Sequence, residues 1–356
     1  MKLKLVYLLS IFSLNQLTFT KEAPYEGVLS VGYGSILQRA HPEQSARLVE
    51  TRNCPGCNLA NAELLFEVLD KSNLFKANLQ GANITSTKFN QSNFQQAKMN
   101  KIHASLAIFD ESNLQGVDGS QGIFSDAYLN NVKATKSNFR LAIFNNAHLV
   151  NANFSESDLT NADFQNALAS QINFTQAKLG FANFSHANLN QANLTNVDAR
   201  STVFIDTHLE FADLAHANLS DAFFEHANLF HANLQNANLN HADCRYAAFT
   251  ATDLTGASMI GADFSNADLF KAKINTQQLD SILLCNTQGV PAKIQNRDCT
   301  KITQVKATMK PIISKKPATE TISHEPIKPA ANTLGWHPTT APAWHPGTPT
   351  AYHPTY

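Results

Sequence analysis

The feature that most constrains this chain is a five-residue rhythm that runs through about two-thirds of its 356 residues. Stepping by five from position 59 to position 284 gives 46 positions, and 40 of them carry Leu, Ile, Met or Phe. The residue two places earlier in each unit is small in 41 of 46 cases, and the residue between is Asn or Asp in 25. A period of five fits neither an α-helix, at about 3.6 residues per turn, nor a long β-strand, at about two.

Each unit predicts a short extended segment of about three residues followed by a two-residue turn. The small and the large residue face inward, and the polar residue between them faces outward. Because the chain turns after every unit, it closes into a coil, and four units give a coil of twenty residues. Every twentieth residue from 124 to 264 is Phe, except Cys244. This spacing supports four units per coil and predicts an internal column of Phe rings.

The unit is plainest as Ala-Asn-Leu at residues 187–189, 192–194 and 232–234. This pattern resembles the pentapeptide-repeat family, whose unit reads A-[D/N]-L-x-x, over residues 54–284. The resemblance implies an all-β fold, a right-handed quadrilateral β-helix of about eleven coils and roughly 50 Å in length at one strand spacing per coil. Open coil ends would expose strand edges and apolar interior, so both ends need covers.

The N-terminal end departs from the rhythm. Residues 1–20 have the form of a secretory signal, with Lys2 and Lys4 before an apolar run at 5–14 that is too short to span a bilayer well. An uncleaved anchor or a buried strand is the alternative interpretation. We expect residues 21–53 to form an N-terminal cap segment and the mature protein to be soluble, with no membrane span after signal removal, and periplasmic or secreted.

The C-terminal end also departs from the rhythm. We expect residues 285–300 to form a cap loop and residues 301–356, rich in Pro, Thr and His, to be a disordered tail. An aromatic-His-Pro unit recurs there every eight residues. These units are either a docking peptide or weak metal site, or part of a solvated low-complexity tail; their aromatic and His residues are Trp336, His337, Trp344, His345, Tyr352 and His353.

The chain has five cysteines. In an exported protein pairing is the default, and a Cys285–Cys299 disulfide would close a short loop worth about 3 kcal/mol. Cys54 and Cys57 form a Cys-x-x-Cys where the repeats begin. Family members are similar at both places, although the turn after Cys285 matches only in part. A redox centre at the Cys-x-x-Cys is the alternative, whereas Cys244 is expected to be a buried free thiol.

The sequence indicates no enzyme, metal or cofactor. His186, His216, His226, His231 and His241 fall on outward turn positions, where we expect them to be surface residues. No glycine-rich phosphate loop, nucleophile elbow or zinc-protease motif is present. The near-neutral net charge of -1 argues against a dedicated nucleic-acid binder.

Apolar residues at outward positions suggest a contact surface. Scattered surface residues are the alternative interpretation. Two pairs are expected to stack on one face and a third pair on another; these residues are Ile123 and Ile143, Val203 and Phe223, and Ile108 and Tyr128.

Two functions compete. The first is a non-enzymatic, exported structural and protein-interaction scaffold, in which a rigid rod presents its faces and a flexible tail to an unknown protein partner, with self-association possible. The second follows from the resemblance, because some family members mimic duplex DNA and bind topoisomerases. Residues 59–284 carry 21 acids and 13 bases, a net of -8. Duplex DNA of that length carries about 30 negative charges, so the rod is a poor electrostatic copy.

Overall fold

The computed structural model describes residues 41–300. The predicted signal at 1–20, most of the predicted cap segment at 21–53 and the tail at 301–356 with its aromatic-His-Pro units lie outside the described residues.

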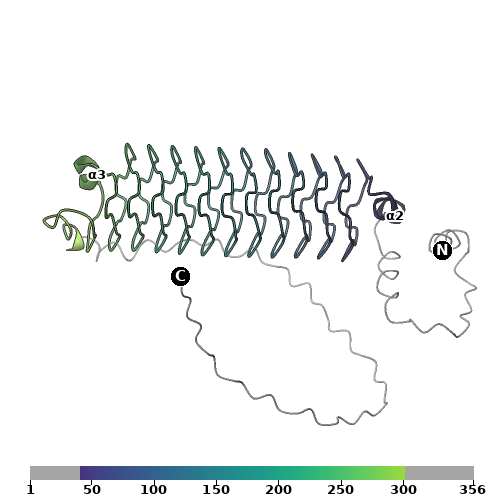
Figure 1. Ribbon diagram of the computed structural model, residues 1–356, viewed down its shortest axis with the longest axis horizontal. Coiled ribbons are helices and arrows are strands. Elements are labelled where there is room, and N and C mark those ends of the chain that lie inside the picture. The colour runs from purple at the N-terminus through teal and green to yellow at the C-terminus, as the bar shows by residue number, and fades with distance from the viewer. Residues whose placement is uncertain (1–40, 301–356) are drawn as a thin grey trace, which may run out of the picture. The chain divides into compact units, whose positions relative to one another are not determined.

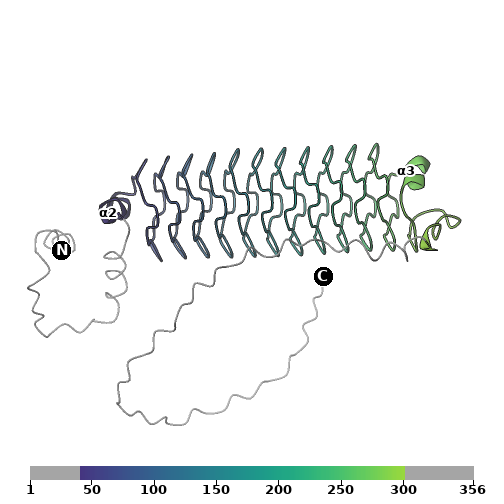
Figure 2. The same cartoon turned by 180° about the vertical axis from the view of Figure 1, so that it is seen from behind.

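The described chain winds into a β-helix in which each coil advances by twenty residues. Parallel bridges join residues twenty apart, from the pair Asn53–Asn73 to the pair Asp268–Gln288. The coils stack side by side between the two helices (Figures 1 and 2). This register confirms four units per coil. We name the four faces A, B, C and D after the columns that begin at Asn53, Asn58, Glu63 and Val68.

The extended segments are shorter than the sequence suggested. In residues 41–300, each unit contributes one bridge residue rather than a strand of three. The bridge is flanked by two hydrogen bonds, as when Leu59 N–H donates to Asn78 O (2.6 Å) and Asn78 N–H donates to Cys57 O (2.8 Å). Backbone groups are therefore paired between coils even though no face is a regular strand.

From residue 55 to residue 271, every corner is a two-residue turn whose second residue has positive φ. Asn61 (φ 54°) shows the geometry: Ala62 N–H donates back to Leu59 O (3.1 Å), and Asn61 N–H donates to Gln80 O of the next coil (2.8 Å). Positive φ at the second central residue is the signature of a type II turn. Non-glycine residues pay about 1 kcal/mol or more for this conformation, which the hydrogen bonds between coils must offset.

The polar residue between the small and the large one has a structural role that the sequence reasoning missed. Asn173 Oδ1 accepts a hydrogen bond from Thr175 N–H (2.9 Å), which fixes the start of the next corner. The other end of the amide can reach the neighbouring coil, as when Asn73 Nδ2 donates to Asn53 Oδ1 (3.1 Å). Asn and Asp are favoured because their short side chains make such bonds to the backbone two residues on.

The interior is filled by the predicted Phe column. Phe144, Phe164 and Phe184 are fully buried, and their rings stack at 4.8 and 4.7 Å with interplanar angles of 8° and 7°. Positions that lack a large residue are filled by their neighbours. At Gly119, an added Cβ would lie 2.4 Å from the ring of Phe139, which occupies that space.

The N-terminal coil is covered by α2 (Pro42–Thr51). Leu48 of this helix is fully buried in the core, and the Gln44 side chain accepts a hydrogen bond from Asn58 N–H. Cys54 and Cys57 are joined by a disulfide directly after the helix.

The C-terminal coil contains α3 (Thr276–Ser281), where the repeat was expected to continue unbroken to residue 284. That expectation was wrong because Asn275 caps a helical turn: its side chain accepts from Gln278 N–H, and the Gln278 side chain accepts from Asn275 N–H. The twenty-residue register continues past the helix, because Asp263 is bridged to Leu283. A second disulfide joins Cys285 to Cys299.

Candidate functional site

Because the interior is filled by side chains, a binding site in the coils can only lie on their outer surface. Twelve large apolar side chains are exposed within residues 41–300. We define side D as face D with the two corners beside it, which are residues 65, 66, 68, 70 and 71 and every twentieth residue after each. Nine of the twelve belong to side D: Phe66, Val68, Leu106, Tyr128, Leu168, Phe211, Phe230, Tyr246 and Phe270. The other three, Leu141, Phe181 and Ile260, lie on the corner between faces B and C.

The structure pairs the predicted contact residues as expected but exposes few of them. The bridged pairs are Ile123–Ile143 and Val203–Phe223 on face C, and Ile108–Tyr128 on face D. Of the six, Tyr128 is exposed and the others are half-buried. The sequence reasoning considered the middle residue of each unit and overlooked the corners. Reading the corner positions down each column would have revealed most of side D.

The middle of side D is a continuous stripe on face D. Ile108, Tyr128, His148 and Leu168 follow one another through successive bridges. The rings of Tyr128 and His148 stack at 4.4 Å with an interplanar angle of 15°. His148 and Leu168 were missed, although both stand in the same twenty-residue column as the predicted pair.

A second group of rings lies on the corner between faces D and A. Phe211 stacks on His231 at 5.5 Å, and Phe230 meets both rings edge-on, at 5.7 Å from Phe211 and 4.3 Å from His231. We call these three residues with Glu210 and His208 the Glu210 cluster. The cluster therefore places a carboxylate and two histidines beside two exposed rings of side D.

The two carboxylate oxygens of Glu210 differ in their hydrogen bonds. Its Oε1 accepts from Asn228 Nδ2 (2.8 Å) and lies 3.4 Å from His208 Nδ1. Its Oε2 is buried and has no hydrogen-bond partner among residues 41–300. An unpaired buried acceptor costs about 1–3 kcal/mol, and more when charged, so the carboxylate is stabilised if its side chain turns this oxygen outward to a donor.

The histidines expected on the surface do lie at corners, with φ near 60° at His186 and His226. His186 Nδ1 lies 3.7 Å from Asp206 Oδ2 in the next coil, and His226 stacks on Tyr246 at 4.9 Å. Across residues 41–300, no three His, Cys, Asp or Glu side chains are arranged to hold a metal ion. These histidines therefore pair with a carboxylate and a ring rather than forming a centre.

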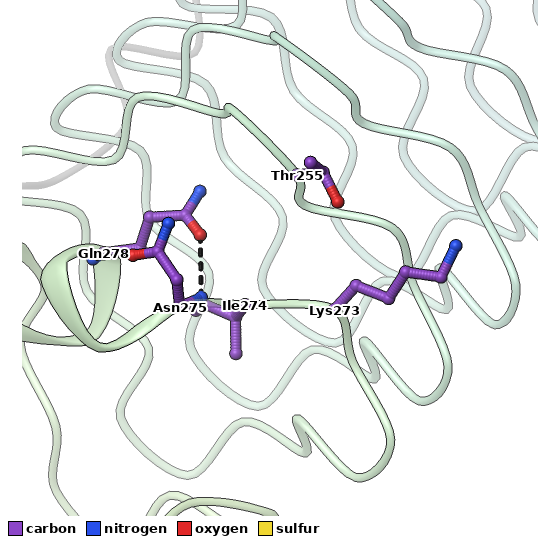
Figure 3. Close-up of a pocket in the computed structure, with 5 residues that line it drawn as sticks. All are labelled: Thr255, Lys273, Ile274, Asn275 and Gln278. Carbon is purple, nitrogen blue, oxygen red and sulfur yellow. Dashed lines mark hydrogen bonds between the residues drawn. The ribbon is translucent and has the colours of Figure 1, made fainter.

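A shallow pocket of about 280 Å³ lies where the last coil meets α3 (Figure 3). The polar side chains that line the pocket form hydrogen bonds within the fold. Gln278 Nε2 donates to Leu254 O (2.7 Å) and to Ala257 O (2.9 Å), and its Oε1 accepts from Asn275 N–H, the bond dashed in Figure 3. Lys273 Nζ donates to Asp253 Oδ2 (2.7 Å). Thr255 Oγ1 likewise donates to Asp253 Oδ1 (2.6 Å), so the charged and hydroxyl groups of the pocket are paired within the fold.

The two remaining chemically notable groups are also structural. Burial raises the pKa of the Cys244 thiol, and the nearby Asp243 and Asp263 carboxylates raise it further. Burial also raises the pKa of Asp253, but hydrogen bonds from Lys273, Thr255 and Gln235 outweigh it, so this pKa lies below its ordinary value. Cys244 is a buried neutral thiol and Asp253 a paired carboxylate, and neither is arranged for catalysis.

The twenty-residue parallel register around an apolar interior defines a four-sided β-helical solenoid. The chain belongs to the pentapeptide-repeat family. The family model described as Pentapeptide repeats matches it in eight copies, over residues 53–91, 87–118, 123–161, 157–196, 177–221, 207–243, 232–269 and 247–275. No curated protein matches the chain significantly. None of the helices in residues 41–300 has the length and apolarity needed to cross a membrane.

Solved structures similar to this chain are themselves pentapeptide-repeat proteins. HetL, involved in heterocyst differentiation regulation in the cyanobacterium Nostoc, is 26% identical, with coverage of 66% of this chain and 94% of HetL and a TM-score of 0.32. A pentapeptide repeat protein from the Arabidopsis thaliana thylakoid lumen is 29% identical, covering 37% of this chain and 84% of that one, with a TM-score of 0.22. QnrB1, a plasmid-mediated fluoroquinolone resistance protein, is 14% identical, covering 71% and 95%, with a TM-score of 0.28.

Proposed function

We propose that this protein is a non-enzymatic, exported scaffold whose β-helix presents its outer faces to a protein partner, with the segment after residue 300 as a tether. The observation that carries the proposal is the closed interior. Large side chains such as Phe164 and Leu189 are fully buried, and the two-residue corners leave no long loop within the coils of residues 53–275. Active sites are usually mounted on loops or in concave pockets, whereas the recognition surface left here is the outside of the coils.

Two experiments test this function. Fractionation of the native host shows the compartment of the protein, and we expect to find the protein in the fraction outside the cytoplasm. A pull-down from that fraction with the tagged full chain should then enrich one or a few proteins in stoichiometric amount. Failure to enrich any protein from any compartment would contradict the scaffold function, and recovery only from the cytoplasm would contradict export.

The DNA-mimic function makes a different prediction. A DNA mimic should inhibit the supercoiling reaction of purified gyrase at stoichiometric concentration. We expect no inhibition, because the net charge of -8 over residues 59–284 falls well short of the roughly 30 charges on duplex DNA of that length. Strong inhibition would replace the scaffold function by the DNA-mimic function.

A further inference from the structure

We propose that side D is the docking surface for a basic protein segment that also carries large apolar side chains, with a Lys or Arg of that segment bound by Glu210. This inference rests on the proposed scaffold function and assigns it a face and a partner chemistry.

The apolar part of the argument is the concentration of exposed side chains. From Phe66 to Phe270 side D spans about ten coils, or about 50 Å at one strand spacing per coil. Side chains such as Phe66 (69% exposed) and Phe211 (55%) project into solvent along this length. Large exposed apolar patches on soluble proteins mark interaction sites. Faces A and B contribute none of the twelve exposed large apolar residues of the described chain.

The charges of the solenoid are also unevenly distributed. Within residues 59–284, side D has eight acids and four bases, giving 4 − 8 = -4. Its acids are Asp70, Asp110, Glu111, Asp126, Asp206, Glu210, Glu225 and Asp268, and its bases are Lys71, Lys88, Arg245 and Lys271. Arg245 is already paired with Asp243 (2.6 Å) and Glu225 (3.5 Å). Faces A and B with the corners A–B and B–C carry nine bases and eight acids in the same range, giving 9 − 8 = +1.

This charge identifies the occupant. A second copy that docked through the same side would bring two surfaces of -4 together, and like charges across an interface are unfavourable. Nucleic acid and anionic lipid are repelled for the same reason. A protein segment with net positive charge complements side D, and its apolar residues can cover the exposed rings.

The Glu210 cluster supplies the anchor point. In the described chain, the ion-pair contact of Glu210 is with His208, and Glu210 Oε2 has no hydrogen-bond donor. The Glu210 side chain is 20% exposed, and a guanidinium or ammonium group that turns its carboxylate outward provides the missing donor as a charge-assisted bond. The adjacent rings of Phe211 and Phe230 can add cation–π attraction, worth about 0.5–2 kcal/mol.

The test is a fluorescence-anisotropy titration of the full chain with three labelled synthetic peptides: three repeats of Lys-Trp-Lys-Ala, of Glu-Trp-Glu-Ala or of Lys-Ala-Lys-Ala. The first should bind at least tenfold tighter than the other two. Glu210→Gln and Phe211→Ser should each weaken it at least fivefold. Phe181→Ser is the matched control, because Phe181 is also a second corner residue (61% exposed) but lies between faces B and C; it should change nothing.

Three results would overturn the inference: equal binding of the acidic Trp peptide, no effect of Glu210→Gln in a variant whose circular dichroism is unchanged, or an equal loss with Phe181→Ser. The pull-down separates this failure from failure of the scaffold function. If wild type and the Glu210→Gln/Phe211→Ser variant enrich the same protein equally, the scaffold stands and side D is not its docking surface. If wild type enriches none, the scaffold function itself fails.

Discussion

Replacing Phe164 by Ala removes one ring from the centre of the stacked column. Phe164 is fully buried, stacks on Phe144 and Phe184 at 4.8 and 4.7 Å, and meets Phe174 edge-on at 5.9 Å. A buried Phe→Ala substitution costs about 3–5 kcal/mol. We expect the upper part of that range, because three rings lose an aromatic partner and each such pair is worth about 0.5–1.5 kcal/mol beyond buried area.

The assay is urea unfolding followed by far-ultraviolet circular dichroism with the disulfides intact. Phe181→Ala is the matched control, because that ring is 61% exposed on a corner, and its loss should change the free energy of unfolding by less than about 0.5 kcal/mol. Solenoids can unfold in steps, so the two variants are compared over the same transition. If Phe164→Ala costs no more than Phe181→Ala, the filled-interior reasoning is refuted.

Three further predictions concern packing, cross-linking and charge. Gly119→Ala should lower the free energy of unfolding by about 1–3 kcal/mol in the same urea assay, since its Cβ would lie 2.4 Å from a core ring; a neutral effect would contradict the packing. A Cys285→Ser/Cys299→Ser double variant should speed amide hydrogen exchange over residues 282–298, and unchanged exchange would show that this disulfide does not hold the cap. Because the Asp253 pKa is lowered in the folded state, the ionised carboxylate stabilises the fold above its unfolded pKa of about 3.9, and this stabilisation is lost as the pH falls further. Lys273→Met should therefore have a lower free energy of unfolding than wild type at pH 7, and the difference should narrow below about pH 4. A difference that stays constant with pH would exclude the Asp253–Lys273 pair as the cause of the destabilisation.

The repeating part of the fold could be predicted because one side-chain pattern determines it. A large residue every five positions and Phe every twenty specify the unit, the coil and the column, as the stacking of Phe144 on Phe164 shows. These are short-range consequences of alternation and volume, which do not depend on distant parts of the chain.

The ends and the candidate surface could be predicted only in part. The α3 helix continues the five-residue frame, with Leu279 inward, and differs from a repeat through the reciprocal bonds of Asn275 and Gln278. Of the Glu210 cluster, the sequence analysis named only His231, because Glu210, Phe211 and Phe230 fall at corner positions that are usually polar. The unpaired state of Glu210 Oε2 depends on how the Asn228 side chain of the next coil bonds the carboxylate, which the residue pattern does not show. The five-residue pattern predicts the register of the coils, whereas the hydrogen bonds of individual side chains are known only from the structure.

The four-unit coil is the claim on which the definition of side D depends, and disulfide trapping tests it most directly. Asn93 and Asn113 are bridged across adjacent coils, about 4.8 Å apart, within the Cα separation of about 4.4–6.8 Å that a disulfide spans. The Asn93→Cys/Asn113→Cys variant should therefore form the new bond on mild oxidation, as seen by peptide mass mapping. The Asn93→Cys/Ile108→Cys variant, fifteen residues apart and on a different face, should not. Bond formation in the second variant and not in the first would contradict the four-sided coil.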